Sequence, residues 1–190
     1  MHVSPTAAAE ERQESDEVLM ERLREGDFRA FDALFGRYAE PIHRFLSRRV
    51  GDAARAEDLT QETFLSVIRG RGRYVAGGSF RQWLYAIAAN AARHDVRARR
   101  RERDRLREVA EWSPTAVGDE AAAVHERAVR QALALLGDGQ REVILLHAYE
   151  GMTFEEIAQV LRTTGGAARV RAHRAYRKLR ELLGHPEEER

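Results

Sequence analysis

The chain has 190 residues, no cysteine, a hydrophobic fraction of 43%, a charged fraction of 33% and a net charge of +1. The apolar content suffices for packed cores, so a globally disordered chain is excluded. The lack of cysteine excludes a disulfide framework and a cysteine-based zinc site. No apolar run of about eighteen residues or signal-peptide pattern occurs, so we expect a cytoplasmic protein without membrane insertion.

Residues 1–15 are small, polar and acidic without periodicity, and we expect a disordered tail. A first helix is predicted from Asp16, acting as its cap, to about Glu25. Pro41 is expected to bend or restart the helical pattern that follows. In that pattern the large apolar residues recur at helical spacing, and core packing is the better interpretation for Phe28, Phe31, Leu34, Phe35, Tyr38, Ile42, Phe45 and Leu46.

Residues 57–69 predict a helix with two unlike faces. The inward face is expected to contain Leu59, Thr63, Phe64 or Leu65, Val67 and Ile68. Asp58, Gln61 and Glu62 fall on the other side, one turn apart. By composition alone, such an acidic and amide patch is usually just a solvated surface.

Residues 79–103 predict a helix with an apolar face and a cationic end. Ser79 and Gln82 have capping-box spacing at its start. One stripe at helical spacing contains Phe80, Trp83, Leu84, Ile87, Ala88 and Ala91. The end is crowded with Arg93, Arg97, Arg99, Arg100, Arg101 and Arg103. Because like charges three and four residues apart repel, an anionic partner is favoured over a merely solvated surface, with nucleic acid as the default candidate.

The last part of the chain predicts a helix-turn-helix. Thr153 and Glu156 form a second capping-box pattern before a short helix, and residues 162–165 make a tight turn before a longer helix. The longer helix has a small apolar face formed by Ala168, Ala172, Ala175 and Leu179. Its arginine face must therefore lie outside, where Arg169, Arg171 and Arg174 could reach bases and phosphates in a major groove.

These patterns predict an all-α fold of two small helical domains joined by a flexible linker, the second containing the helix-turn-helix. The expected boundaries are a tail at 1–15, a first domain at 16–103, a linker at 104–119, a second domain at 120–184 and a tail at 185–190. The linker contains Trp112, which could pack on either domain or meet a partner.

Three stretches together resemble bacterial sigma factors of the sigma-70 family, in the small two-domain extracytoplasmic-function (ECF) group. The sequence EDLTQETFLSVI resembles the family's polymerase-binding helix, and SFRQWLYAIAANAARHDVRARRR resembles its promoter-melting helix. The third stretch, MTFEEIAQVL with GGAARVRAHRAYRKLRELL, resembles its terminal helix-turn-helix. At 166–172 the chain departs from the family's common Gly-Thr-Val-Lys-Ser-Arg-Leu opening, so a promoter sequence cannot be transferred.

The resemblance implies a protein that binds core RNA polymerase and directs it to promoter DNA, with an anti-sigma factor as a further partner. It implies polymerase contacts by Asp58, Gln61, Glu62 and Leu65. It implies recognition of the minus-ten element and help in strand opening by Trp83, Asn90, Arg93, Arg97 and Arg100. It implies recognition of the minus-thirty-five element by Arg169, Val170, Arg171, His173 and Arg174.

Other functions stay open at this point. A repressor or activator could use the helix-turn-helix alone, with the first domain as a sensory or dimerising bundle, and it would bind duplex DNA tightly without polymerase. An RNA-binding adaptor would instead prefer structured RNA. An enzyme is the least favoured class, because the acids and histidines are scattered and the glycine-rich loop at 71–78 lacks the Lys-Ser/Thr ending of a phosphate loop. We therefore predict no catalytic residue, metal site or cofactor.

Overall fold

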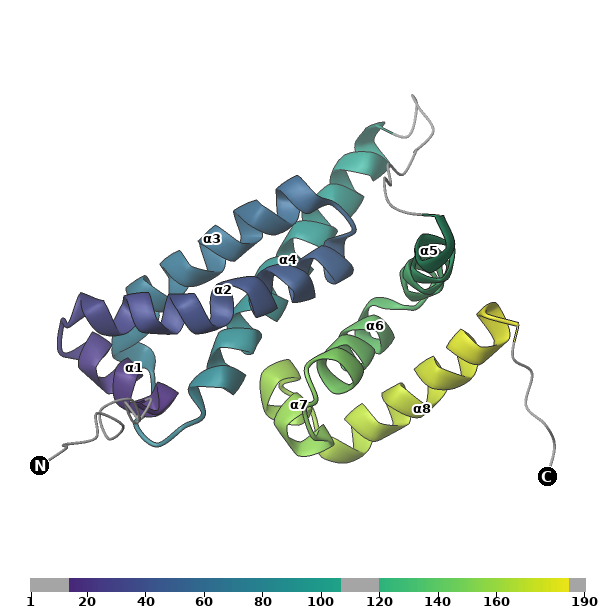
Figure 1. Ribbon diagram of the computed structural model, residues 1–190. Coiled ribbons are helices and arrows are strands. Elements are labelled where there is room, and N and C mark those ends of the chain that lie inside the picture. Colours follow the sequence, from purple (N-terminus) through teal and green to yellow (C-terminus); the bar gives the residue numbers. More distant parts are fainter. Residues whose placement is uncertain (1–13, 107–119, 185–190) are drawn as a thin grey trace, which may run out of the picture.

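The computed structural model describes residues 14–106 and 120–184 (Figure 1). All regular structure in these two stretches is helical, which confirms the predicted all-α class. Residues 1–13, 107–119 and 185–190 lie outside the described part, and with them Trp112, most of the predicted linker and both predicted tails. None of the described helices combines the length and the apolar character needed to cross a membrane.

The first domain contains α1 (Asp16–Arg24), α2 (Phe28–Val50), α3 (Ala53–Gly70) and α4 (Phe80–Leu106). A single 3₁₀ turn, Arg71–Arg73, follows α3. Helix α1 packs on α2, α2 on α3, and α3 on α4. The turn between α2 and α3 needs Gly51, whose φ of 73° lies in the left-handed region, and Asp52 then caps α3 by accepting from the Arg55 amide at 3.0 Å.

Three expectations for this domain need correction. Ser15, not Asp16, caps α1 and accepts from the Val18 amide, because Asp16 instead accepts hydrogen bonds from Arg37 and Tyr38. Helix α2 does not restart at proline: it is continuous through Pro41. Finally, Phe28 and Phe35 were expected in the core but are exposed, because their neighbours cover them only in part: Phe35 meets Phe64 of α3, and Phe28 meets the guanidinium of Arg71.

The second domain contains α5 (Glu120–Ala134), α6 (Asp138–Ile144), a π-helical turn (Leu145–Tyr149), α7 (Phe154–Leu161) and α8 (Gly165–Leu182). Both bonds of the predicted capping box at the start of α7 are present: the Glu156 amide donates to Thr153 at 3.2 Å and the Thr153 amide donates to Glu156 at 2.8 Å. Arg162 ends α7 with a φ of 52°, and Thr164 caps α8. The predicted helix-turn-helix is therefore confirmed.

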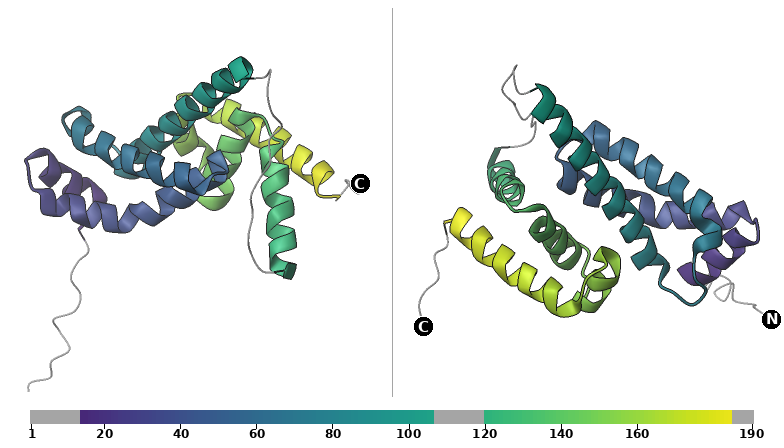
Figure 2. Two further views of the ribbon diagram at one scale, coloured as in Figure 1. Left: turned by 90° about the horizontal axis from the view of Figure 1, so that it is seen from above. Right: turned by 180° about the vertical axis from the view of Figure 1, so that it is seen from behind.

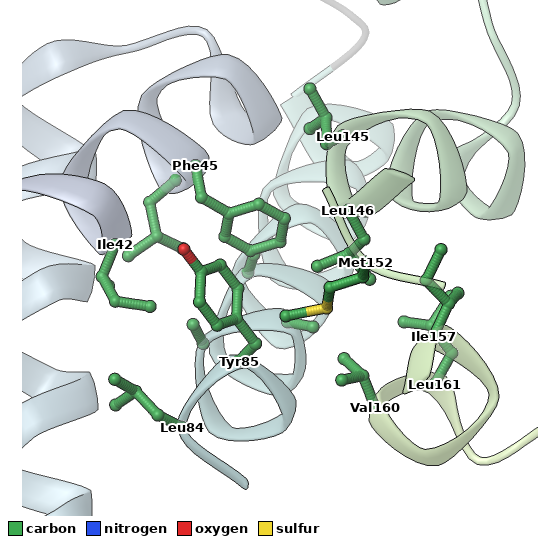
Figure 3. Packing of buried hydrophobic residues seen from close by; sticks show 14 of the residues in the cluster. Ile42, Phe45, Leu84, Tyr85, Leu145, Leu146, Met152, Ile157, Val160 and Leu161 are labelled. Carbon is green, nitrogen blue, oxygen red and sulfur yellow. The ribbon is translucent and has the colours of Figure 1, made fainter. Parts of the chain in front are cut away.

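The two domains pack directly against each other (Figure 2). Helix α7 packs on α4, and the π-helical turn packs on α2. Figure 3 shows Phe45 and Tyr85 of the first domain facing Leu146 and Met152 of the second. All four side chains are buried, so one apolar core is continuous across both domains.

Candidate polymerase and nucleic-acid interfaces

Helix α3 has the two faces that its sequence predicts. Asp58, Gln61, Glu62 and Leu65 are all exposed, and their spacing places them on one side of the helix. Leu59, Thr63, Phe64 and Val67 are buried on the other side. The structure resolves the open choice between Phe64 and Leu65: Phe64 points inward, and Leu65 stays 47% exposed beside the acids.

Aromatic rings of α2 extend this exposed patch. The ring of Phe35 lies 4.8 Å from that of Phe64 and 6.0 Å from that of Phe31, with centroids as the reference points. Phe35 is 43% exposed and Phe28 is 52% exposed. Sequence reasoning missed these two residues, because helical spacing alone does not say whether a neighbouring helix covers the face. Large exposed aromatic side chains beside polar groups are typical of protein-binding surfaces.

An ion-pair cluster fixes α3 to α4. Asp95 is buried on α4, and its carboxylate lies 2.7 Å from Nε of Arg55 and 3.3 Å from Nε of Arg99. Arg55 also approaches Asp58 at 3.3 Å, and Arg99 approaches Asp52 at 3.3 Å. The cluster determines how the cationic end of α4 is oriented relative to the exposed patch of α3.

Helix α4 presents Asn90 at the border between its buried stripe and its arginine-rich end. Asn90 is exposed, and its Oδ1 accepts a hydrogen bond from Arg93 at 2.9 Å. Arg97 and Arg100 are exposed, whereas Arg93 is half-buried and also lies 3.4 Å from Glu142 of the second domain. Trp83 is held between Tyr74 and Phe80, with ring centroids 5.4 and 6.2 Å away, so most of its indole belongs to the domain core.

Helix α8 buries the small apolar face predicted for it. Ala168, Ala172 and Ala175 are buried, and Leu179 packs against the same core. The opposite side carries the residues predicted for major-groove contact, all exposed: Arg169, Val170, Arg171, His173 and Arg174. Long exposed donors on the second helix of a helix-turn-helix suit contact with base edges and phosphates.

The first residues of α7 hold one of these arginines. The guanidinium of Arg169 lies 5.3 Å from the ring centre of Phe154 and 3.4 Å from the carboxylate of Glu155. The same carboxylate would lie only 3.1 Å from a Cβ at Gly165, so a larger residue there would displace it.

Family comparisons match both domains. A model described as Sigma-70 region 2 matches residues 34–102, and one described as Sigma-70, region 4 matches residues 126–179. RNA polymerase sigma factor CarQ of Myxococcus xanthus is 47% identical over 169 residues, which is 88% of this chain and 97% of CarQ. The ECF RNA polymerase sigma-E factor of Haemophilus influenzae is 30% identical over 173 residues, which is 85% of this chain and 91% of that protein.

A solved structure has the same arrangement. The structure of CnrH in complex with the cytosolic domain of CnrY has a TM-score of 0.73 and 26% sequence identity, and the match covers 92% of this chain and all of CnrH. With two region models in order and relatives matched over nearly their whole length, the chain belongs to the sigma-70 family of RNA polymerase sigma factors, in the ECF group.

Proposed function

We propose that this protein binds core RNA polymerase and directs it to specific promoters. The observation that carries the proposal is that one chain presents three distinct surfaces: the exposed acidic and apolar patch of α3, the cationic end of α4, and the arginine face of α8. A sigma factor needs all three, whereas a repressor that reads duplex DNA needs only the last. Family membership supports the same function.

In this proposal Asp58, Gln61, Glu62 and Leu65 dock on the polymerase. Helix α4 recognises the minus-ten element and assists strand opening. Its residues for this are Trp83, Asn90, Arg93, Arg97 and Arg100. The exposed amide of Asn90 offers a donor and an acceptor to an unpaired base, and the arginines that follow track the phosphate backbone. Trp83 is largely enclosed by Tyr74 and Phe80. Its main role is therefore to pack the start of α4 into the domain core, and it offers little ring surface for stacking with a base.

Helix α8 reads the minus-thirty-five element in the major groove through Arg169, Val170, Arg171, His173 and Arg174. Arg169 and Arg174 supply long cationic donors, while the absence of hydroxyl groups at Ala167 and Val170 leaves those positions to apolar contacts. The protein is not itself an enzyme, and it acts in the cytoplasm with the polymerase. CnrH is bound by the cytosolic domain of a second protein, which supports an anti-sigma factor as a further partner of this chain.

In vitro transcription tests the proposal. Core polymerase and a library of genomic templates are incubated with and without the protein, and transcript start sites are mapped. A set of new start sites that share two upstream elements is expected only when the protein is present. If the protein instead binds duplex DNA tightly but creates no start site, it is a repressor or activator of the simpler kind.

A further inference from the structure

We infer that Phe154 and Glu155 of α7 form a clamp that positions Arg169 of α8 to read a base edge, and that this clamp determines how strictly α8 selects its DNA sequence. The inference rests on the proposed function, because it assumes that α8 enters the major groove of a promoter. Its starting point is that the three arginines proposed for this contact have different surroundings.

Arg169 is the one arginine of the three whose side chain is bound to another helix in the described part of the chain. Its guanidinium carbon lies 5.3 Å from the centre of the Phe154 ring, and its Nη2 lies 3.4 Å from Oε1 of Glu155. Among the described residues, neither Arg171 nor Arg174 forms a hydrogen bond or an ion pair through its side chain. The three arginines are therefore not equivalent before DNA arrives.

The ring beneath Arg169 is itself held in place. Phe154 is the first residue of α7, and its ring stacks on the imidazole of His147, with centroids 4.5 Å apart and planes 28° apart. Nδ1 of His147 donates to the backbone carbonyl of Met152 at 2.8 Å, since a carbonyl oxygen can only accept. Phe154 also packs against the apolar core. The guanidinium of Arg169 thus rests on a ring that has little freedom to move.

Glu155 holds Arg169 without being needed for the fold. Its side chain is 71% exposed and lies outside the capping box of Thr153 and Glu156. A Cβ at Gly165 would lie 3.1 Å from its Oε1, so the glycine leaves room for the carboxylate beside the start of α8. Because an exposed ion pair contributes little to stability, the main effect of this one is on the direction of the Arg169 side chain.

The two contacts favour a base over a phosphate as the partner of Arg169. This residue lies near the start of α8, and the first residues of the second helix in a helix-turn-helix face base edges. The Glu155 carboxylate offsets part of its charge and repels a phosphate beside it. A guanidinium held in a fixed plane suits the paired acceptors O6 and N7 of guanine. Arg171 and Arg174 have no such partner, so they are left to follow the phosphates.

A selection experiment with the holoenzyme tests the clamp. Core polymerase carrying the full chain is incubated with duplexes that keep the minus-ten element of a mapped promoter and have a randomised upstream element, and the bound duplexes are sequenced. The wild type should favour one guanine by about 5- to 150-fold, and Arg169→Ala should abolish that preference. Glu155→Gln and Phe154→Leu should each reduce it by about 2- to 5-fold.

Glu181→Gln is the matched control. It also removes an exposed carboxylate that pairs with an arginine, since Glu181 lies 4.0 Å from Arg177 near the end of α8, and it should leave the preference unchanged. Phe154→Tyr keeps the ring and should retain the preference. Because the clamp acts through Arg169, adding Glu155→Gln to Arg169→Ala should change nothing further at that base pair.

The salt dependence of binding provides a readout that a loss of packing would not change in this way. Once released from Glu155, Arg169 can approach a phosphate. Glu155→Gln should therefore steepen the slope of log affinity against log salt by up to about one unit, while the preference for the guanine falls. The steepening should be absent when Arg169→Ala is also present.

Failure of the inference and failure of the proposed function give different results. If the wild-type holoenzyme selects no base in the upstream element, the proposed role of α8 fails and the inference fails with it. If it selects bases there, but Glu155→Gln and Phe154→Leu select them as strictly as the wild type, only the inference is overturned. An equal loss of selection at every position in both variants would also overturn it, because a clamp on one arginine acts at one base pair.

Discussion

Nε of Arg55 in α3 donates a hydrogen bond to Oδ1 of Asp95 in α4 at 2.7 Å, across 40 residues of sequence. Asp95 is buried, while Arg55 is one turn before the exposed patch that we assign to polymerase binding. The pair therefore links the two proposed functional surfaces of the first domain. It fixes the relative orientation of α3 and α4 without itself lying on either surface.

Asp95→Ala should lower the free energy of unfolding by about 1–3 kcal/mol, because Arg55 and Arg99 lose the partner that compensates their partial burial. Urea unfolding followed by circular dichroism measures this. Arg44→Ala removes an exposed pair with Glu40 on the surface of α2 and should change stability by less than about 0.5 kcal/mol. Equal effects of the two variants would show that Asp95 does not contribute to stability through its ion pairs.

The capping box of α7 predicts a pH dependence. Hydrogen bonding from the Thr153 amide lowers the pKa of Glu156 below its ordinary value of 4.5, and Arg81 and Gln82 of α4 act in the same direction. A lowered pKa in the folded state means that the ionised carboxylate stabilises the fold above the unfolded pKa. That contribution is lost as the pH falls through the folded pKa.

Glu156→Gln should therefore be less stable than the wild type above pH 4.5, and the difference should shrink toward more acidic pH. Urea unfolding at a series of pH values between about 7 and about 3 measures the difference. Glu155→Gln is the control, since this neighbour lies outside the capping box. A stability difference that is constant over the whole range would contradict the proposed role of the charge.

Helical periodicity predicted much of this architecture, because a strong apolar stripe both defines a helix and identifies the face that it buries. The stripe of α4 and the alanine face of α8 are examples. The burial of Arg49 cannot be predicted from helical periodicity. Arginine is rarely buried unless it is paired, and the contacts that bury Arg49 come from Asp138 and Glu142, about ninety residues away in the sequence.

The docking surface can be tested without disturbing the fold. Asp58, Gln61 and Glu62 are exposed, so replacing all three with alanine should leave the thermal melt nearly unchanged. The affinity for core polymerase should fall by about tenfold or more if these side chains contribute as interface hot spots. Glu25→Ala with Glu40→Ala removes the same number of negative charges elsewhere and should not weaken binding. Unchanged affinity in the triple variant would rule out this surface.

The exposed aromatic side chain beside that patch gives an independent test. Phe35→Ala should weaken polymerase binding by a similar factor, because the exposed ring adds apolar contact area beside Phe64 of α3. Its stability cost should be small for an aromatic residue, since the ring is 43% exposed in the free protein. Phe45→Ala, which truncates a buried ring of the same helix, should instead lower the melting temperature. A Phe35 variant with normal affinity would confine the docking surface to α3.

Initial binding to promoter DNA should depend on α8, whereas strand opening should depend on α4. Arg169 and Arg174 are exposed on α8 and should contact duplex DNA before melting, so replacing either with alanine should weaken initial binding. Where the lost contact is to a phosphate, the slope of log affinity against log salt should become shallower by about one unit. Arg44→Ala removes an exposed cation from α2 of the other domain and should change neither quantity.

Asn90→Ala should leave initial binding nearly intact and reduce opening, because an amide that pairs with an unstacked base contributes only once the strands part. The substitution removes the bond from Arg93 to Asn90, while Arg93 keeps its hydrogen bond to the Ala89 carbonyl and its ion pair with Glu142. Permanganate footprinting of unpaired thymines, run beside a duplex-binding titration, measures both steps. Normal opening by Asn90→Ala, or a loss of duplex binding as large as that of the arginine variants, would contradict this division between α4 and α8.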